Sequence, residues 1–197
     1  MLDSILAFAA VDAAQADGAS DYSAQESLPL ARIGDGADWV WQASALHITY
    51  AADPTTVSMA RPFQYFDWVS DMGTAWARTK KNAISQGSGP MKAFLMKQNI
   101  AWVRQCTAWC VGERDQVASL LEGLNAIGPL VRNGWGRIAE VKVVSDPDGA
   151  TRWNRRILPL SLSAHKTDEH ALGTSVLRAP YWERSREQEV WDYIGAA

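Results

Sequence analysis

The stretch GERDQVASLLEGLNAIGPLVRNGWGRIAEVKVV, residues 112–144, contains three consecutive elements of the predicted fold. Its first part, 113–124, carries acidic residues at the start and then four apolar residues at helical spacing, which predicts an amphipathic helix. Three glycines between 128 and 136 then mark a turn. Apolar and polar residues alternate over 137–144, which predicts a strand. The order helix, glycine-rich turn, strand is therefore the centre of the predicted fold.

Elements on either side extend this order. The other predicted elements are a helix at 3–16, a strand at 39–50, two strands at 92–97 and 100–111 with a turn at Gln98-Asn99, a turn at 146–149 and a closing helix at 187–194. Helices on one face of an antiparallel sheet in this order indicate the α+β class and an RRM/ferredoxin-like domain. The first strand of that layout, which would precede Asp3, is missing from the sequence.

A length of 197 residues suits one domain with a substantial insertion. The stretch 52–91 is interrupted by prolines and by the sequence SQGSGP, so it is predicted to be an inserted, thumb-like arm. We therefore predict an RRM-like core at 1–51 and 92–160, the arm at 52–91 and a C-terminal extension at 161–197.

Composition excludes several classes of protein. The chain is 47% hydrophobic and 21% charged, so it can bury a core. Cys106 and Cys110 would lie about 13 Å apart on one strand, which predicts two buried thiols rather than a disulfide or a shared metal. The N-terminal apolar stretch has no preceding Lys or Arg, and no run is long enough to span a membrane. A cytoplasmic protein with no membrane segment and no cofactor is expected.

Charge is distributed unevenly along the chain. Residues 1–60 carry a formal charge of −7, whereas residues 61–145 carry +5. An acid-free window within the basic part holds Arg78, Lys80, Lys81, Lys92 and Lys97. Such a window indicates either a confined site for a polyanion or a solvated loop, and charge alone leaves both interpretations open.

The glycine turn matches a dinucleotide-binding pattern only formally. Gly134 to Ala139 reads G-x-G-x-x-A, but that pattern must follow a strand and open a helix, and here the order is reversed. Glycine backbone can still approach a phosphate closely, and Arg132 and Arg137 flank the turn. Spacing alone favours a tight turn with ordinary flanking charges.

The ten tryptophans are predicted mostly to pack in the core, with some available as interface anchors or as platforms for base stacking.

Beyond these patterns, the stretch 79–144 resembles the RAMP superfamily of CRISPR class 1 effector subunits. Those proteins carry an RRM-like domain with a glycine-rich loop between its second helix and its last strand. The segments LDSILAFA, SGPMKAF and RAPYW are similar to those of the Cas-five-type subunit of type IV systems, the Csf family.

The resemblance implies a non-catalytic subunit of an antiviral ribonucleoprotein effector complex. Such a subunit binds the 5′ handle of the CRISPR RNA (crRNA), caps the filament of backbone subunits and supports RNA-guided DNA targeting. The implied partners are the crRNA, a Cas-seven-like backbone subunit, a large subunit, a DinG-type helicase and target DNA. The implied RNA-binding residues are Arg78, Lys80, Lys81, Lys92, Arg132, Asn133, Gly134, Trp135, Gly136 and Arg137, with Gly128 in the same loop.

Two other hypotheses remain open at this stage. The first is a metal-independent ribonuclease that processes precursor crRNA, with His47 as general base and a lysine as acid or charge stabiliser. A lone histidine on an apolar strand is more often structural, which favours a protein without catalysis. The second is a protein-interaction module with a Trp-rich surface.

The RNA-binding subunit makes a quantitative prediction. If Lys80, Lys81, Arg132 and Arg137 all contact phosphates, log K against log salt should have a slope of about −3.

Overall fold

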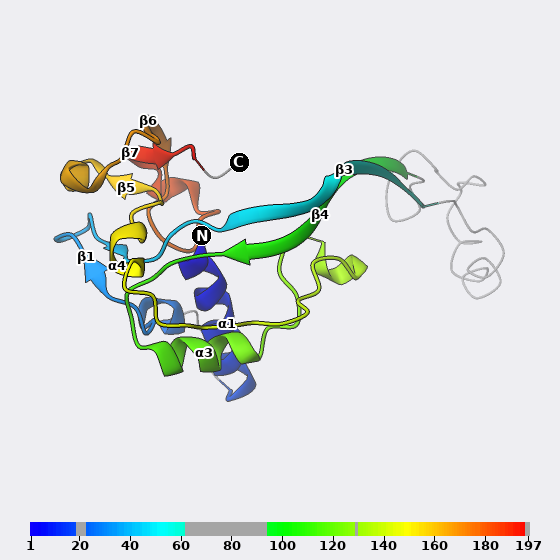
Figure 1. Cartoon of the computed structure of the whole chain (residues 1–197), viewed down its shortest axis with the longest axis horizontal. Coiled ribbons are helices and arrows are strands. Elements are labelled where there is room, and N and C mark those ends of the chain that lie inside the picture. The colour runs from blue at the N-terminus through cyan, green and yellow to red at the C-terminus, as the bar shows by residue number, and fades with distance from the viewer. Residues whose placement is uncertain (19–22, 62–93, 129, 196–197) are drawn as a thin grey trace, which may run out of the picture. The chain divides into compact units, whose positions relative to one another are not determined.

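A computed structural model describes residues 1–18, 23–61, 94–128 and 130–195 (Figure 1). The described chain mixes helices with small antiparallel sheets, as expected for the α+β class. It divides into two units, one formed by Met1–Ile48 with Gln105–Ala197 and the other by Thr49–Arg104. Within the described ranges, no helix combines the length and the apolar character that crossing a membrane would require.

Two helices of the first unit confirm the sequence prediction. Helix α1 spans Leu2–Ala16, and helix α3 spans Arg114–Glu122. Buried side chains of α1, Leu2 and Leu6 among them, share a core cluster with Val117 of α3 and with Trp41. The apolar spacing read from the sequence for 113–124 is therefore the spacing that packs α3 against this cluster.

The predicted turn at 146–149 is also present, and it leads into the short helix α4 (Gly149–Arg152). The carboxylate of Asp146 accepts a hydrogen bond of 2.9 Å from the Asp148 amide, and the Gly149 amide donates to the Asp146 carbonyl. An aspartate that bonds to the backbone two residues on is a common device for starting such a turn.

Strands of the first unit form two small sheets. Strand β1 (Arg32–Ile33) pairs antiparallel with β2 (Val40–Trp41). In the second sheet β7 (Gln188–Tyr193) lies between β5 (Leu158–Pro159) and β6 (His170–Ser175), and both neighbours are antiparallel to it.

The predicted closing helix at 187–194 is wrong, because this segment is strand β7. Val190 of β7 is fully buried in a cluster with Val40, Trp153, Leu158 and Leu177, whereas the neighbouring Glu189 is exposed. Pairing with β5 on one side and β6 on the other satisfies the backbone groups of this segment as a strand.

A long two-stranded sheet is formed by β3 (His47–Arg61) and β4 (Phe94–Thr107). Figure 1 shows the two strands side by side and running in opposite directions. The predicted turn at Gln98-Asn99 is wrong, since β4 continues through it and the Asn99 side chain bonds to Thr56 of β3 at 2.9 Å. The predicted strand 39–50 is interrupted between β2 and β3. Of the predicted arm, residues 62–91 lie outside the described residues.

The strand predicted at 137–144 is wrong as well. Only Arg137 pairs with another strand-like residue there, in an isolated bridge to Ala126. A strand needs a partner for its backbone groups, and the apolar alternation gives no information about whether one is available. Val143 instead packs against the core cluster around α1.

A fully buried arginine connects the segments of the first unit. The Arg156 guanidinium donates to the carbonyl oxygens of Trp41 (2.5 Å) and Leu177 (2.7 Å) and lies 3.2 Å from the Asp3 carboxylate. The Tyr181 hydroxyl donates to the same carboxylate at 2.7 Å. Burial alone would lower the pKa of Arg156, but the adjacent Asp3 carboxylate raises it above the ordinary value. This Arg156 network holds α1, β2 and the C-terminal segment together.

Candidate nucleic-acid interface

The loop between Asn125 and Ile138, here called the glycine loop, is closed by its own backbone. The Ile127 amide donates to the Gly136 carbonyl and the Ile138 amide to the Asn125 carbonyl, both at 2.9 Å. A short 3₁₀ turn at Val131–Asn133 lies between these ends. The loop is therefore held in shape at its neck, and its described residues are exposed or half-buried.

Two glycines of this loop have different roles. Gly136 has a φ of +71°, and a Cβ there would overlap the carbonyl oxygen of Ile127. Gly134 has a φ of +82°, but a Cβ there would meet nothing within 4 Å. Gly136 is thus required by the close approach at the neck, while Gly134 is required only by its backbone conformation.

Several backbone amides of the loop are already used within it. Asn133 and Trp135 donate to the Leu130 carbonyl, and Gly134 donates to the Val131 carbonyl. The amides of Gly136 and Arg137 donate to no backbone carbonyl among the described residues. These two amides, together with side chains of the loop, are therefore available for contact with an anion.

The loop brings five of the predicted RNA-binding residues together, namely Asn133, Gly134, Trp135, Gly136 and Arg137. Asn133 and Arg137 are exposed and Trp135 is half-buried. None of these three side chains has a hydrogen-bond or ion-pair partner in the part of the chain that the structure describes. The side chain of Arg132 and the whole of Arg78, Lys80, Lys81 and Lys92 lie outside it.

A second surface of the first unit combines arginine with aromatic rings. The guanidinium carbons of Arg152 and Arg155 lie 5.3 and 5.4 Å from the ring centroid of Trp109, and the His47 ring meets Trp109 edge-on at 4.9 Å. Arg152 is paired with Asp148 at 3.4 Å. Arg155 has no carboxylate partner among the described residues, so its charge is available to a ligand.

Sequence reasoning did not select Arg152 or Arg155, because their approach to Trp109 arises only in the folded chain. The run TRWNRR at 151–156 was the available signal, since it concentrates three arginines around a tryptophan.

His47 occupies the start of β3 beside this surface. Its Nε2 is buried and has no hydrogen-bond partner among the described residues. Burial lowers the pKa of His47, the positive charge of Arg155 lowers it further, and Glu169 acts in the opposite direction. Tyr193, whose hydroxyl donates to Glu169 at 2.9 Å, lies 6.1 Å away between ring centroids. The imidazole is thus favoured in its neutral form.

Other predicted features are placed as follows. Trp41 and Trp153 are buried, as expected for core tryptophans, but Trp182 is 81% and Trp102 53% exposed. The prediction of two buried thiols is wrong for Cys106, which is exposed, while Cys110 is half-buried. No three His, Cys, Asp or Glu side chains within the described ranges gather as they would around a metal ion.

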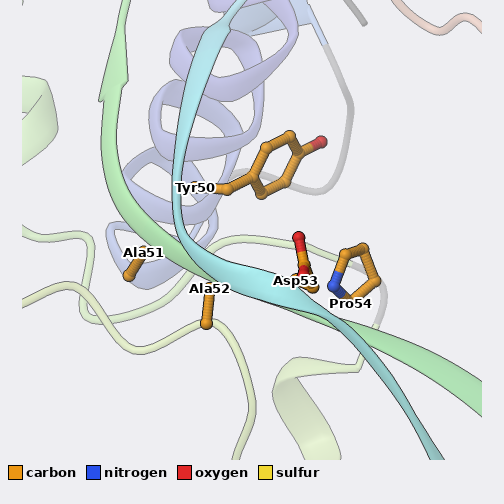
Figure 2. A pocket seen from close by; sticks show the side chains of 5 residues that line it. All are labelled: Tyr50, Ala51, Ala52, Asp53 and Pro54. Carbon is orange, nitrogen blue, oxygen red and sulfur yellow. The ribbon is translucent and has the colours of Figure 1, made fainter.

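An open hollow of about 530 Å³ lies on the second unit, against residues 50–54 of β3. Figure 2 shows the Tyr50 ring, Asp53 and Pro54 on one side of the ribbon and the two alanines on the other. All five lining residues are consecutive, and the charged one is an acid. The only charged side chain among the described residues that line the hollow is thus Asp53, which disfavours an anionic ligand there.

Comparison with known proteins identifies the family. The chain matches the family described as CRISPR type IV associated protein Csf3 over residues 1–192, a range that includes α1, the glycine loop and the C-terminal sheet. No curated protein is significantly similar to it. The resemblance to the type IV Csf family noted from the sequence is thereby confirmed. The chain belongs to the Csf3 family of CRISPR type IV associated proteins.

Proposed function

We propose that this Csf3 family member is a non-catalytic, RNA-binding subunit of a type IV CRISPR effector complex. Its glycine loop binds the 5′ handle of the crRNA, and the subunit caps the filament of Cas-seven-like backbone subunits. Membership of the Csf3 family supports the complex, and the exposed loop with its unpartnered polar side chains supports the RNA contact. The RRM-like core and the thumb-like arm at 52–91 are part of the same proposal.

The chemistry of the loop suits a single strand of RNA. Arg137 can pair with a phosphate through two parallel N–H donors, assisted by the amides of Gly136 and Arg137. Trp135 can stack on a base, a contact worth about 1–3 kcal/mol. Asn133 can hydrogen-bond to a base edge or to a 2′-hydroxyl. The closed neck of the loop presents these groups without further ordering, which lowers the entropic cost of binding.

A binding titration with a labelled single-stranded RNA that carries the repeat-derived handle tests the proposal. Trp135→Ala should weaken binding by roughly 5- to 150-fold, which corresponds to the loss of one stacked base. Arg137→Gln should reduce the salt slope by about 0.7. Matched controls are Trp182→Ala, which removes a more exposed tryptophan, and Arg114→Gln, which removes an exposed arginine of α3. A flat salt dependence, or equal losses in the controls, would contradict RNA binding by the glycine loop.

A metal-independent ribonuclease is the second candidate function, because His47 keeps an unpartnered Nε2 near the free Arg155. The same RNA, incubated with the purified protein and a chelator, reveals any cleavage on a denaturing gel. Binding without cleavage supports the non-catalytic subunit. Cleavage that disappears in His47→Ala would replace it with the ribonuclease.

A further inference from the structure

Two arginine side chains of the first unit stack on the ring of Trp39. The guanidinium carbon of Arg32, in β1, lies 4.4 Å from the Trp39 ring centroid, and that of Arg178 lies 4.1 Å from it. Arg32 also lies 4.5 Å from the Trp41 ring, which meets Trp39 edge-on. Stacking on aromatic faces fixes both guanidinium groups in position.

Main-chain carbonyls, rather than carboxylates, hold these cations. Arg178 donates to the carbonyl oxygens of Ala37 (2.9 Å) and Trp39 (2.6 Å), and Arg32 donates to the Glu26 carbonyl. Neither arginine has a carboxylate within ion-pair distance among the described residues. Their positive charges therefore remain uncompensated by direct contact.

A third arginine, Arg186, interacts electrostatically with Arg178. Arg186 donates to the Ala179 carbonyl at 3.2 Å and pairs only loosely with Glu183, at 3.7 Å. Burial lowers the pKa of Arg178, the charge of Arg186 lowers it further, and Glu26 acts in the opposite direction. The charges of Arg186 and Arg32 thus both act against the charge of the half-buried Arg178.

Arg178 keeps hydrogen-bond donors that have no partner among the described residues. The Nε of Arg178 is buried and has no hydrogen-bond partner in the part of the chain described. A guanidinium has five N–H donors, and Arg178 uses only one nitrogen in the two bonds to carbonyls. An anion that binds beside Arg178 would satisfy these donors and relieve the repulsion.

We propose that Arg32 and Arg178, both stacked on Trp39, form a phosphate-binding site separate from the glycine loop. The proposal rests on the proposed function for its ligand, the phosphodiester backbone of the bound RNA. Arg178 opens the RAPYW segment, and Tyr181 of the same segment belongs to the Arg156 network. One short motif therefore contributes both to the fold and to this site.

The decisive variant is Arg32→Gln, because Arg32 is exposed and its removal breaks only one backbone contact. In the RNA titration it should lower affinity about 3- to 10-fold at low salt and reduce the salt slope by about 0.7. Arg178→Lys, which keeps the charge but not the forked geometry, should also weaken binding. Arg114→Gln is the matched control and should leave both quantities unchanged.

A second arm uses inorganic tripolyphosphate and thermal unfolding. Tripolyphosphate should raise the melting temperature of the unmodified protein more than that of Arg32→Gln, because the ligand stabilises only the state that binds it. If the unmodified protein binds RNA but both arginine variants keep its affinity and slope, this site is refuted and the glycine loop stands. If RNA does not bind while tripolyphosphate stabilises in an Arg32-dependent way, the proposed function fails and the phosphate site stands with a small polyphosphate as its ligand. If Arg32→Gln changes neither RNA binding nor the stabilisation by tripolyphosphate, the inference is overturned.

Discussion

The Arg156 network and the glycine loop satisfy backbone groups in opposite ways. In the network one buried side chain bonds to carbonyl oxygens from distant segments, and Asp3 and Tyr181 complete it. In the loop the backbone bonds to itself at the neck, and the side chains of Asn133 and Arg137 keep no partner among the described residues. The first arrangement connects the fold, whereas the second leaves polar groups available at the surface.

This difference predicts that losses of stability and losses of binding arise in different places. Buried polar groups are costly to unpair, so damage to the network should appear in unfolding measurements. Exposed side chains contribute little to stability, so damage to the loop should appear in binding measurements. Substitutions that affect both regions in the same way would remove the distinction.

The largest effect is expected for Asp3→Ala. This change leaves the fully buried Arg156 without its carboxylate, and removal of one partner from such a pair costs about 3–5 kcal/mol. Asp3→Asn should cost less, because an amide oxygen still accepts hydrogen bonds. The free energy of unfolding in urea measures both.

The control for Asp3 lies on the same helix. Asp12 is exposed on α1, so Asp12→Ala should change the free energy of unfolding by less than about 0.5 kcal/mol. If Asp12→Ala and Asp3→Ala destabilise the protein equally, the effect belongs to the charge of α1 and not to the Arg156 network.

A smaller effect is expected at the neck of the glycine loop. Gly134→Ala adds only the strain of a positive φ, about 1 kcal/mol, because nothing surrounds its Cβ. Gly136→Ala adds the same strain and must also push Ile127 away, so it should cost more and open the loop. Under the proposed function its affinity for handle RNA should fall at least about tenfold further than that of Gly134→Ala.

Urea unfolding and the RNA titration together read out this pair of variants. Equal stability and equal affinity for the two alanine variants would show that the closed neck does not hold the loop in its binding shape.

The parts of the fold that were predicted correctly are formed by interactions within one short segment of sequence. Helix α1 follows from an apolar, alanine-rich stretch and α3 from local apolar spacing. The turn at 146–149 follows from an aspartate that bonds to nearby backbone. The segment 137–144 alternates but forms no strand, whereas 188–193 does not alternate in sequence and yet pairs with strands on both sides. Sequence pattern describes the faces of a strand but not the availability of a neighbour.

The features of the candidate site also differ in whether their signal is local in the sequence. The glycine loop could be located because it lies within one short stretch and its glycines mark it. Arg178 contacts Trp39, and Arg155 contacts Trp109, although the members of each pair are far apart in the sequence. Such contacts arise from tertiary packing, so no local spacing announces them.

The smallest effect is expected from pH and concerns His47. Its pKa in the folded protein is lowered, first by burial and then by Arg155, from the ordinary value of 6.5. The unfolded chain therefore binds a proton at a higher pH than the folded protein does, and stability falls as the pH drops below about 6.5. The loss levels off once the pH passes the folded pKa, because both states are then protonated.

His47→Gln isolates this contribution from that of the other groups. The variant should lack the part of the decline that His47 causes, so its urea-unfolding curve should change less between pH 7 and pH 5. The Arg156 guanidinium stays charged throughout this range because its pKa is raised. The measurement therefore compares a buried group whose charge is constant with a half-buried ring that titrates. An identical decline in the variant would assign the pH dependence to other groups and would leave the buried Nε2 of His47 without an energetic consequence.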